Sequence, residues 1–402
     1  MTKNTAIPAI RFKGFTAPWE QRKLRELASF NPKDELPQTF EYVDLESVAG
    51  TEMLSHRTET KSSAPSRAQR IARPGDLFYQ TVRPYQKNNY LFERPDNNYV
   101  FSTGYAQMRP LVDGYFLLCL VQNERFVKIV LDNCTGTSYP AINANDLAEI
   151  EITAPSNEEE AHKIGTIFRS IDRLITLHQR KSEKLLTIKK SMLEKMFPKK
   201  GSCYPEIRFK GFTAPWEQRK LGDVADIIGG GTPSTGNPSY WDGNIDWYAP
   251  AEIANQIFVN SSQRKITELG YENCSAKMLP LGTVLFTSRA GIGKTAILTK
   301  KGCTNQGFQS IVPHYGKLDS YFIFSRTDEL KQYGELVGAG STFVEVSGKQ
   351  MAAMTLMMPP TLREQQTVGQ FFSELDTLIT LHQRKLKKLH NIKKSMLENM
   401  FV

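Results

Sequence analysis

Two long stretches of this chain carry apolar residues at helical spacing. One stripe begins at Ile164 and extends, with an interruption, to Met196, and the second runs in the same way from Val368 to Met400. Apolar positions three and four residues apart are typical of one face of an α-helix. Each stripe follows a proline, a capping Ser, Asn or Thr and a glutamate, and Pro198 ends the first. The pattern predicts two helices of about 40 residues, each roughly 60 Å long if unbroken.

A helix of this length needs an equally long partner, because no ordinary globular core covers its whole apolar face. Each predicted helix is the natural partner of the other. The contact is expected at eight apolar positions: Ile164, Phe168, Ile171, Ile175, Val368, Phe372, Leu375 and Ile379. The spacing does not fix the direction of pairing.

The chain contains an internal repeat. Residues 175–197 and 379–401 are identical at 18 of 23 positions without a gap, and residues 8–24 recur at 205–221 with a single change. Each half of the chain therefore begins with the same opening segment and ends with the same helix. Self-similarity of this kind indicates one structural unit used twice. The duplication favours an antiparallel helix pair, with pseudo-two-fold symmetry generated within one chain.

The regions between the repeated segments differ in sequence but share a skeleton. Gly75–Tyr79 resembles Gly282–Phe286 as a short strand after a turn, and Asp113–Phe116 resembles Asp319–Phe322 as a helix start. We interpret the fold class as α/β (α+β), with two similar globular domains each followed by a long helix, the helices forming an antiparallel coiled coil. The expected divisions are a first domain over 1–155, a helix over 156–198, a second domain over 199–359 and a helix over 360–402.

Charge is concentrated at the two helix ends. The chain has a formal net charge of +9, residues 178–200 and 382–402 carry +6 and +5, and the remaining chain is therefore slightly acidic at −2. Solvated helix faces account for individual lysines, but a basic protein keeps a polyanion among its expected partners.

Composition places the chain in the cytoplasm. Its five cysteines are widely spaced without a C-x-x-C pair, which favours a reducing compartment over a zinc module. The N-terminal residues lack the apolar core of a signal peptide. The longest apolar run, at 115–121, is too short to cross a bilayer. We therefore expect no metal and no membrane contact.

Three short segments resemble known ligand-binding or catalytic motifs, but each lacks a part that the motif requires. Ser288–Thr295 resembles the end of a phosphate-binding loop but lacks the first glycine and a following helix. Gly229–Gly231 is followed by prolines, which is typical of a turn-rich loop. Asn237–Tyr240 is similar to the N-P-P-Y/F tetrapeptide of DNA amino-methyltransferases, with serine at its second proline. We find no catalytic constellation.

Polar loops follow the equivalent strands of the two halves. Arg and Lys side chains can bind guanine, and Asn and Gln can pair with adenine. The shared position of the loops makes them our candidates for contact with DNA bases. The candidate residues are Arg83, Tyr85, Gln86, Lys87, Asn88 and Asn89 in the first half, and Thr287, Ser288, Arg289, Lys294 and Thr295 in the second.

Over nearly its full length the sequence resembles the specificity (S) subunits of bacterial type I restriction-modification systems. The similar segments are P-W-E-Q-R-K-L at 18–24 and 215–221, G-G-G-T-P-S at 229–234, L-F-x-S-R-x-G-I-G-K-T at 285–295 and the K-K-S-M-L-E helix endings. Their order and duplication make the resemblance specific.

The resemblance implies a noncatalytic protein of defence against foreign DNA. Its two variable domains would be target-recognition domains, each reading one half of a bipartite double-stranded DNA target, and its helices would separate the half-sites. Modification (M) and restriction (R) subunits would be partners and would bind S-adenosylmethionine, ATP and magnesium, none of which this chain would hold. Two other functions stay open: a stand-alone DNA adenine methyltransferase using Asn237–Tyr240, and a coiled-coil scaffold without a nucleic-acid role.

Overall fold

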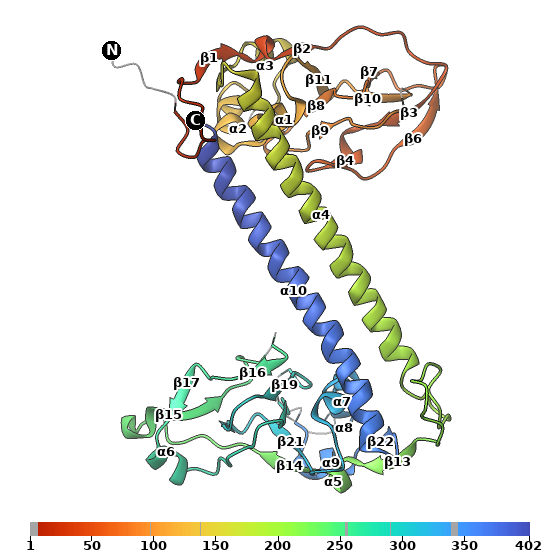
Figure 1. The fold of residues 1–402 in the computed structure, drawn as a ribbon, viewed down its shortest axis with the longest axis vertical. Helices are drawn as coiled ribbons and strands as arrows, with labels where there is room; N and C mark the ends of the chain where they lie inside the picture. The colour runs from red at the N-terminus through yellow and green to blue at the C-terminus, as the bar shows by residue number, and fades with distance from the viewer. Residues whose placement is uncertain (1–6, 97, 137, 254–255, 290, 339–344) are drawn as a thin grey trace. The chain divides into compact units, whose positions relative to one another are not determined.

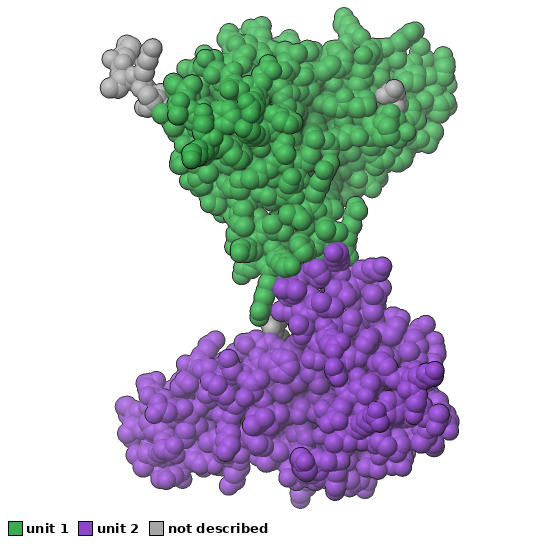
Figure 2. Space-filling view, in the orientation of Figure 1, with its two compact units in different colours: residues 1–180, 383–402 green, residues 181–382 purple. Residues whose placement is uncertain are grey.

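A computed structural model describes residues 7–402 apart from positions 97, 137, 254–255, 290 and 339–344. The chain divides into two compact units (Figure 2). Unit 1 comprises residues 1–180 and 383–402, and unit 2 comprises residues 181–382. Each unit therefore contains one globular domain, the beginning of the long helix that follows it, and the end of the other long helix.

The two long helices are α4, Glu158–Lys195, and α10, Leu362–Met400 (Figure 1). The sequence places them at 156–198 and 360–402. Among the described residues, no helix is both long enough and apolar enough to span a membrane.

The domain of unit 1 is built on two four-stranded sheets, ordered β6-β3-β10-β7 and β2-β11-β8-β9. All pairings in them are antiparallel except β3 with β10. The pairs β1-β12 and β4-β5 form separate ribbons. The strands are β1 Glu20–Lys23, β2 Ala28–Phe30, β3 Thr39–Val43, β4 Val48–Ala49, β5 Glu52–Met53, β6 Arg57–Thr60, β7 Ala68–Ile71, β8 Leu77–Gln80, β9 Tyr90–Leu91, β10 Tyr99–Ser102, β11 Tyr105–Pro110 and β12 Glu151–Ala154.

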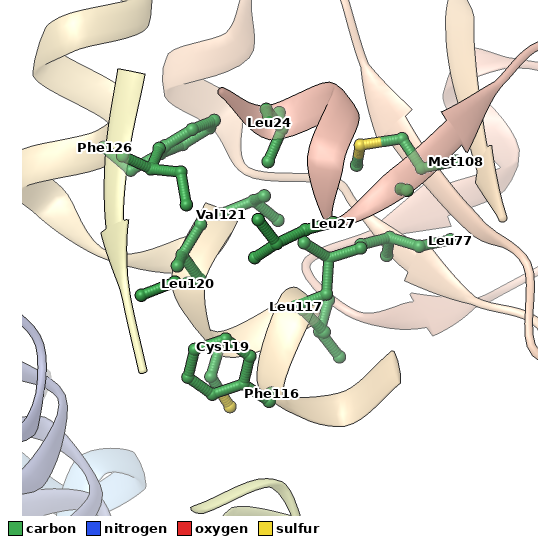
Figure 3. Packing of buried hydrophobic residues seen from close by; sticks show 14 of the residues in the cluster. Leu24, Leu27, Leu77, Met108, Phe116, Leu117, Cys119, Leu120, Val121 and Phe126 are labelled. Carbon is green, nitrogen blue, oxygen red and sulfur yellow. The ribbon is translucent and has the colours of Figure 1, made fainter. Parts of the chain in front are cut away.

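Short helices complete this domain. The α-helices are α1 Gly114–Gln122, α2 Glu124–Asp132 and α3 Ala144–Glu149, and the 3₁₀ helices are η1 Leu24–Glu26, η2 Leu45–Ser47 and η3 Pro84–Gln86. Helix α1 is buried from Phe116 to Val121 because nearly every side chain in it is apolar. Figure 3 shows Leu27 beside Leu117 and Val121 of this helix in the core of unit 1.

The domain of unit 2 repeats the plan with different sheets. One has five strands, ordered β14-β21-β18-β19-β16, and one has three, ordered β17-β15-β20, while β13 and β22 form a ribbon. The strands are β13 Glu217–Lys220, β14 Ala225–Gly229, β15 Trp241–Tyr248, β16 Phe258–Val259, β17 Arg264–Ile266, β18 Val284–Phe286, β19 Thr295–Leu298, β20 Cys303–Thr304, β21 Gln309–Pro313 and β22 Thr355–Met358. The helices are α5 Leu221–Val224, η4 Pro238–Tyr240, α6 Glu268–Glu272, α7 Ser320–Phe324, α8 Thr327–Gly338 and α9 Gly348–Ala353. The mixed α/β class expected from the sequence is confirmed.

The repeated opening segment has the same structure in both units. Its E-Q-R-K residues form β1 and β13, which pair antiparallel with β12 and β22, the strands that lead into the long helices. Upstream of the strand, an arginine and a tryptophan both bind one glutamate in the first turns of the helix. In unit 1, Arg11 lies 2.6 and 2.7 Å from the two Glu160 oxygens, and Trp19 Nε1 donates to Oε1 at 3.3 Å.

Unit 2 contains the same three-residue arrangement. Arg208 donates to the Glu364 carboxylate at 2.7 and 2.8 Å, and Trp216 Nε1 donates to it at 3.0 Å. Glu160 and Glu364 are almost fully buried. The hydrogen bond with its glutamate raises the pKa of each arginine. A buried carboxylate needs such a partner, because an unpaired charge in the interior is strongly destabilising.

In unit 1 the end of α10 packs against the beginning of α4. The rings of Phe168 and Phe401 are 6.0 Å apart, and Lys393 Nζ lies 2.6 Å from the Asp172 carboxylate. As α4 advances from 168 to 172, the contact on α10 moves back from 401 to 393, so these segments run antiparallel. The Tyr115 hydroxyl also donates to Asp172, at 2.7 Å.

Unit 2 contains the equivalent contact between the end of α4 and the beginning of α10. The rings of Phe197 and Phe372 are 6.0 Å apart, Lys189 Nζ lies 2.6 Å from Asp376, and the Tyr321 hydroxyl donates to the same carboxylate at 2.8 Å. These segments are also antiparallel, which is the direction that the internal repeat favours. A coiled coil along the whole length of the helices stays a prediction.

Candidate nucleic-acid interface

The first candidate loop connects β8 to β9 in unit 1. Its centre is the 3₁₀ helix η3, flanked by Arg83 at φ 54° and Lys87 at φ 56°. Both residues adopt the left-handed conformation, which residues other than glycine rarely occupy and which needs support from surrounding structure.

Neighbouring segments supply that support. The Gly50 N–H donates to Asn88 Oδ1 at 2.8 Å, and Gln122 Nε2 donates to the Lys87 carbonyl at 3.0 Å. Inside the loop, Gln80 Nε2 donates to Gln86 Oε1 at 2.9 Å. The loop is therefore fixed at several points and presents its side chains from a defined backbone.

The candidate side chains of this loop differ in their exposure to solvent. Tyr85 and Gln86 are exposed, whereas Arg83, Lys87 and Asn88 are half-buried. Asn89 is 1% exposed, and its Oδ1 accepts from the Gln80 N–H at 2.9 Å. Its side chain holds the loop together from inside and is not presented to a ligand.

The second candidate loop is the tip of the hairpin between β18 and β19. The Thr287 N–H donates to the Lys294 carbonyl and the Gly293 N–H donates to the Thr287 carbonyl, both at 3.0 Å. Gly293 has φ 94°, and a Cβ there would lie 2.4 Å from Lys331 Cβ. The second glycine of G-I-G is thus needed for a left-handed turn packed against α8. Ala290 of the same motif lies outside the described residues.

Three of the candidates at this hairpin are buried. Thr287 Oγ1 bonds within the turn, to the Gly291 carbonyl at 2.8 Å, and Thr295 Oγ1 lies 2.7 Å from Thr327 Oγ1. Ser288 is fully buried. Arg289 and Lys294 are exposed, and Arg289 Nε lies 2.8 Å from Glu345 Oε1. Among the described candidates of this hairpin, the side chains available to a nucleic acid are therefore Lys294 and the ion-paired Arg289.

The sequence candidates omit two residues that the structure places beside the loops. Tyr139 lies against Arg83 in unit 1, and Glu345 lies against Arg289 in unit 2. Both belong to the segments before the short helices α3 and α9, far along the chain from the loops that they contact. The sequence signal for these segments is that residues 136–142 line up with 340–346 when the ungapped helix repeat is extended upstream.

The motifs set aside in the sequence have structural roles. Ser288–Thr295 is a hairpin turn followed by a strand, unlike a phosphate-binding loop, which a helix follows. Gly230 packs so closely on Asn305 that a Cβ would lie 1.9 Å from its carbonyl oxygen. In Asn237–Tyr240, Asn237 caps η4 by accepting from the Ser239 N–H at 3.1 Å.

All eight apolar positions chosen for the helix contact are buried. In unit 1, Ile164 and Phe168 join the core that also contains Met400 and Phe401. In unit 2, Val368, Phe372 and Leu375 join the core that contains Met196. Ile171, Ile175 and Ile379 are between 5% and 8% exposed.

The tyrosine hydroxyls beside the helix contacts have shifted pKa values. Burial raises the pKa of Tyr115 and Tyr321, and the neighbouring aspartates Asp172 and Asp376 raise them further. Within the part of the chain that the structure describes, no group of three His, Cys, Asp or Glu side chains could hold a metal ion.

Comparison with known proteins gives one family. Residues 18–187 and 214–391 each match the family described as "Type I restriction modification DNA specificity domain". These two matches cover most of the chain and correspond to its two repeats.

Two curated relatives illustrate the match. The chain is 34% identical over 190 residues to the type I restriction enzyme MjaIX specificity subunit of Methanocaldococcus jannaschii, covering 46% of this chain but only 44% of that protein. It is 19% identical over 388 residues to the HindI specificity subunit of Haemophilus influenzae, covering 79% of this chain and 84% of that one.

A solved structure shares the fold. The type I restriction-modification system S subunit from M. genitalium superposes with a TM-score of 0.64 at 14% identity, covering 98% of this chain and 99% of that one.

Proposed function

Because this chain belongs to the family of type I restriction-modification DNA specificity domains, we propose that it recognises a bipartite DNA sequence, with one half-site read by each unit. Partner modification subunits would carry out methylation at the recognised site, and restriction subunits would cleave DNA that lacks it. The chain itself would be noncatalytic. S-adenosylmethionine, ATP and magnesium would bind to those partners.

The observation that best supports this proposal is the duplication of a loop within a shared domain plan. Each unit extends a polar loop from the strand after an equivalent turn, and each loop carries cations at the surface. The loops differ in sequence and conformation, whereas the opening segments and helix ends are nearly identical. Nearly identical opening segments and helix ends that carry different loops are suited to a protein that reads two different half-sites.

The structure narrows the residues proposed to contact DNA. Asn89, Thr287, Ser288 and Thr295 are buried, and the residues with exposed or half-buried side chains stay candidates for recognition. The remaining candidates are Arg83, Tyr85, Gln86, Lys87 and Asn88 in unit 1, and Arg289 and Lys294 in unit 2.

The proposal is tested with the chain assembled with its modification subunits and with duplex libraries randomised in one half-site at a time. Lys294→Ala should change recognition of the second half-site and leave the first intact, since Lys294 belongs to unit 2. A lost base contact should cost about 1–3 kcal/mol at one position, whereas a lost phosphate contact should weaken all sequences and reduce the salt dependence. An effect confined to the first half-site, or a wild-type complex without any sequence preference, would contradict the proposal.

The alternatives give different results. A stand-alone methyltransferase would transfer methyl groups from a labelled donor to DNA without any partner, and we expect no transfer by the purified chain. A coiled-coil scaffold would produce no sequence-selective retention of duplex DNA, with or without modification subunits.

A further inference from the structure

Arg83 in unit 1 is stacked on an aromatic ring at the surface. Its guanidinium carbon lies 4.5 Å from the centroid of the Tyr139 ring, within the range of a cation–π interaction. The tyrosine is 64% exposed, so the stack lies where a ligand can reach it. In the described part of the chain, no hydrogen bond or ion pair is made by the Arg83 guanidinium.

The backbone fixes the two residues beside one another. The Arg83 N–H donates to the Pro140 carbonyl at 2.8 Å, and the Ile142 N–H donates to the Thr81 carbonyl at 3.0 Å. Val82 and Ala141 form an antiparallel bridge between these segments. The stack therefore joins side chains whose Cα positions are already set, and Arg83 keeps its left-handed backbone within this bonded crossing.

Unit 2 has the same backbone crossing with a different side-chain partner. The Val346 N–H donates to the Ser288 carbonyl at 3.0 Å, next to the ion pair of Arg289 Nε with Glu345. Each unit thus holds an arginine of its loop against the segment before a short helix. The partner is an aromatic face in unit 1 and a carboxylate in unit 2.

The two partners leave different chemistry available. An aromatic ring contacts the face of the guanidinium and leaves its N–H edges free for planar acceptors. A carboxylate engages those edges and places a negative charge beside them. A guanidinium with free edges can donate two hydrogen bonds to guanine O6 and N7 in the major groove.

We propose that Arg83 contacts a guanine of the first half-site and that Tyr139 is the positioning residue that orients its guanidinium for this contact. This inference depends on the proposed function, because it names the base and the supporting residue within the same site.

The test uses the complex of the full chain with its modification subunits and a duplex library randomised in the first half-site. Arg83→Ala should abolish the preference for guanine at one position, a change of about 5- to 150-fold. Tyr139→Ala should weaken the same preference by about 2- to 5-fold, since an exposed cation–π contact contributes about 0.5–1 kcal/mol. Tyr139→Phe should retain the preference because it keeps the ring. Tyr315→Ala, at a fully exposed tyrosine of unit 2, is the matched control.

Several outcomes would overturn the inference. Tyr139→Ala could leave the guanine preference unchanged, it could weaken all sequences equally, or Tyr139→Phe could behave like Tyr139→Ala. Should Tyr139→Ala lower the melting temperature, Tyr139→Leu is the second variant, because it retains an apolar side chain without a π face and should still weaken the guanine preference. A wild-type complex that selects no sequence would defeat the proposed function itself, whereas a selective complex that is insensitive to Tyr139 would defeat only this inference.

Discussion

At the scale of single residues, two buried glutamates explain why the chain repeats its opening segment. Glu160 and Glu364 each accept from an arginine and a tryptophan of that segment. The opener and the first turns of the helix are thereby joined at the same point in both units. Substituting one partner leaves a charge in the interior without its counterpart, and this is what makes buried ion pairs costly to break.

Glu160→Gln should therefore destabilise the protein by about 3 kcal/mol, because it leaves Arg11 without its carboxylate. The measurement is chemical denaturation followed by circular dichroism. Glu159→Gln is the matched control, since Glu159 pairs with Lys163 at the surface and such pairs contribute at most about 1 kcal/mol. Equal losses for the two variants would show that burial of Glu160 is unimportant.

At the scale of elements, the end of each long helix completes the core of the domain that it reaches. Phe401 lies near Trp19, Phe116 and Phe168, with ring centroids 5.7 to 6.1 Å apart. Phe197 holds the equivalent place in unit 2, beside Trp216, Phe322 and Phe372. The two phenylalanines are one repeat apart, yet each belongs to the core of a different unit.

We expect Phe401→Ala to destabilise unit 1 by about 3–5 kcal/mol, the usual effect of emptying an aromatic site in a core. Phe197→Ala should destabilise unit 2 by less, because Phe197 is only partly buried. Hydrogen exchange resolved by peptide would locate the loss. Deletion of Val402, which is 38% exposed, is the control and should have little effect. Increased exchange of residues 217–358 on Phe401→Ala would contradict the assignment.

The long helices and the domain plan could be predicted from the sequence because a 3.6-residue period and a near-identical repeat are local signals. The loops could be predicted only in part. The sequence predicts recognition roles for four residues whose polar groups are in fact buried: Asn89, Thr287, Ser288 and Thr295. Tyr139 was not predicted, since its contact with Arg83 depends on tertiary pairing of distant segments.

At the scale of the whole molecule, unit 1 is formed from two separate stretches of chain, and each unit includes the end of the long helix from the other half of the sequence. Unit 1 contains the end of α10 and unit 2 contains the end of α4. Cutting the chain between its two halves would therefore divide both units. Lys199 and Lys200, which follow α4, are exposed and give a position for such a cut.

Inserting a specific protease site after Lys200 and cleaving there should yield two fragments that stay together. Both fragments should co-elute on size exclusion under native conditions. Each fragment contributes the end of its long helix to the core of the unit whose domain belongs to the other fragment. Uncleaved protein is the reference, and Phe401→Ala in the cleaved form should weaken the association. Separate elution of the fragments of the unmutated chain would disprove this interdependence.

The place of Phe401 also sets an order for biosynthesis. A ribosome synthesises the domain at residues 20–154 before the second domain, but Phe401, whose ring closes the core of the first domain, follows the second domain along the chain. Until Phe401 is synthesised, apolar surface therefore stays exposed on Trp19, Phe116 and Phe168. Exposed apolar surface favours aggregation or chaperone binding. The second domain has no such delay, because Phe197 is synthesised before it. The core of the first domain is thus completed only after the second domain has been synthesised.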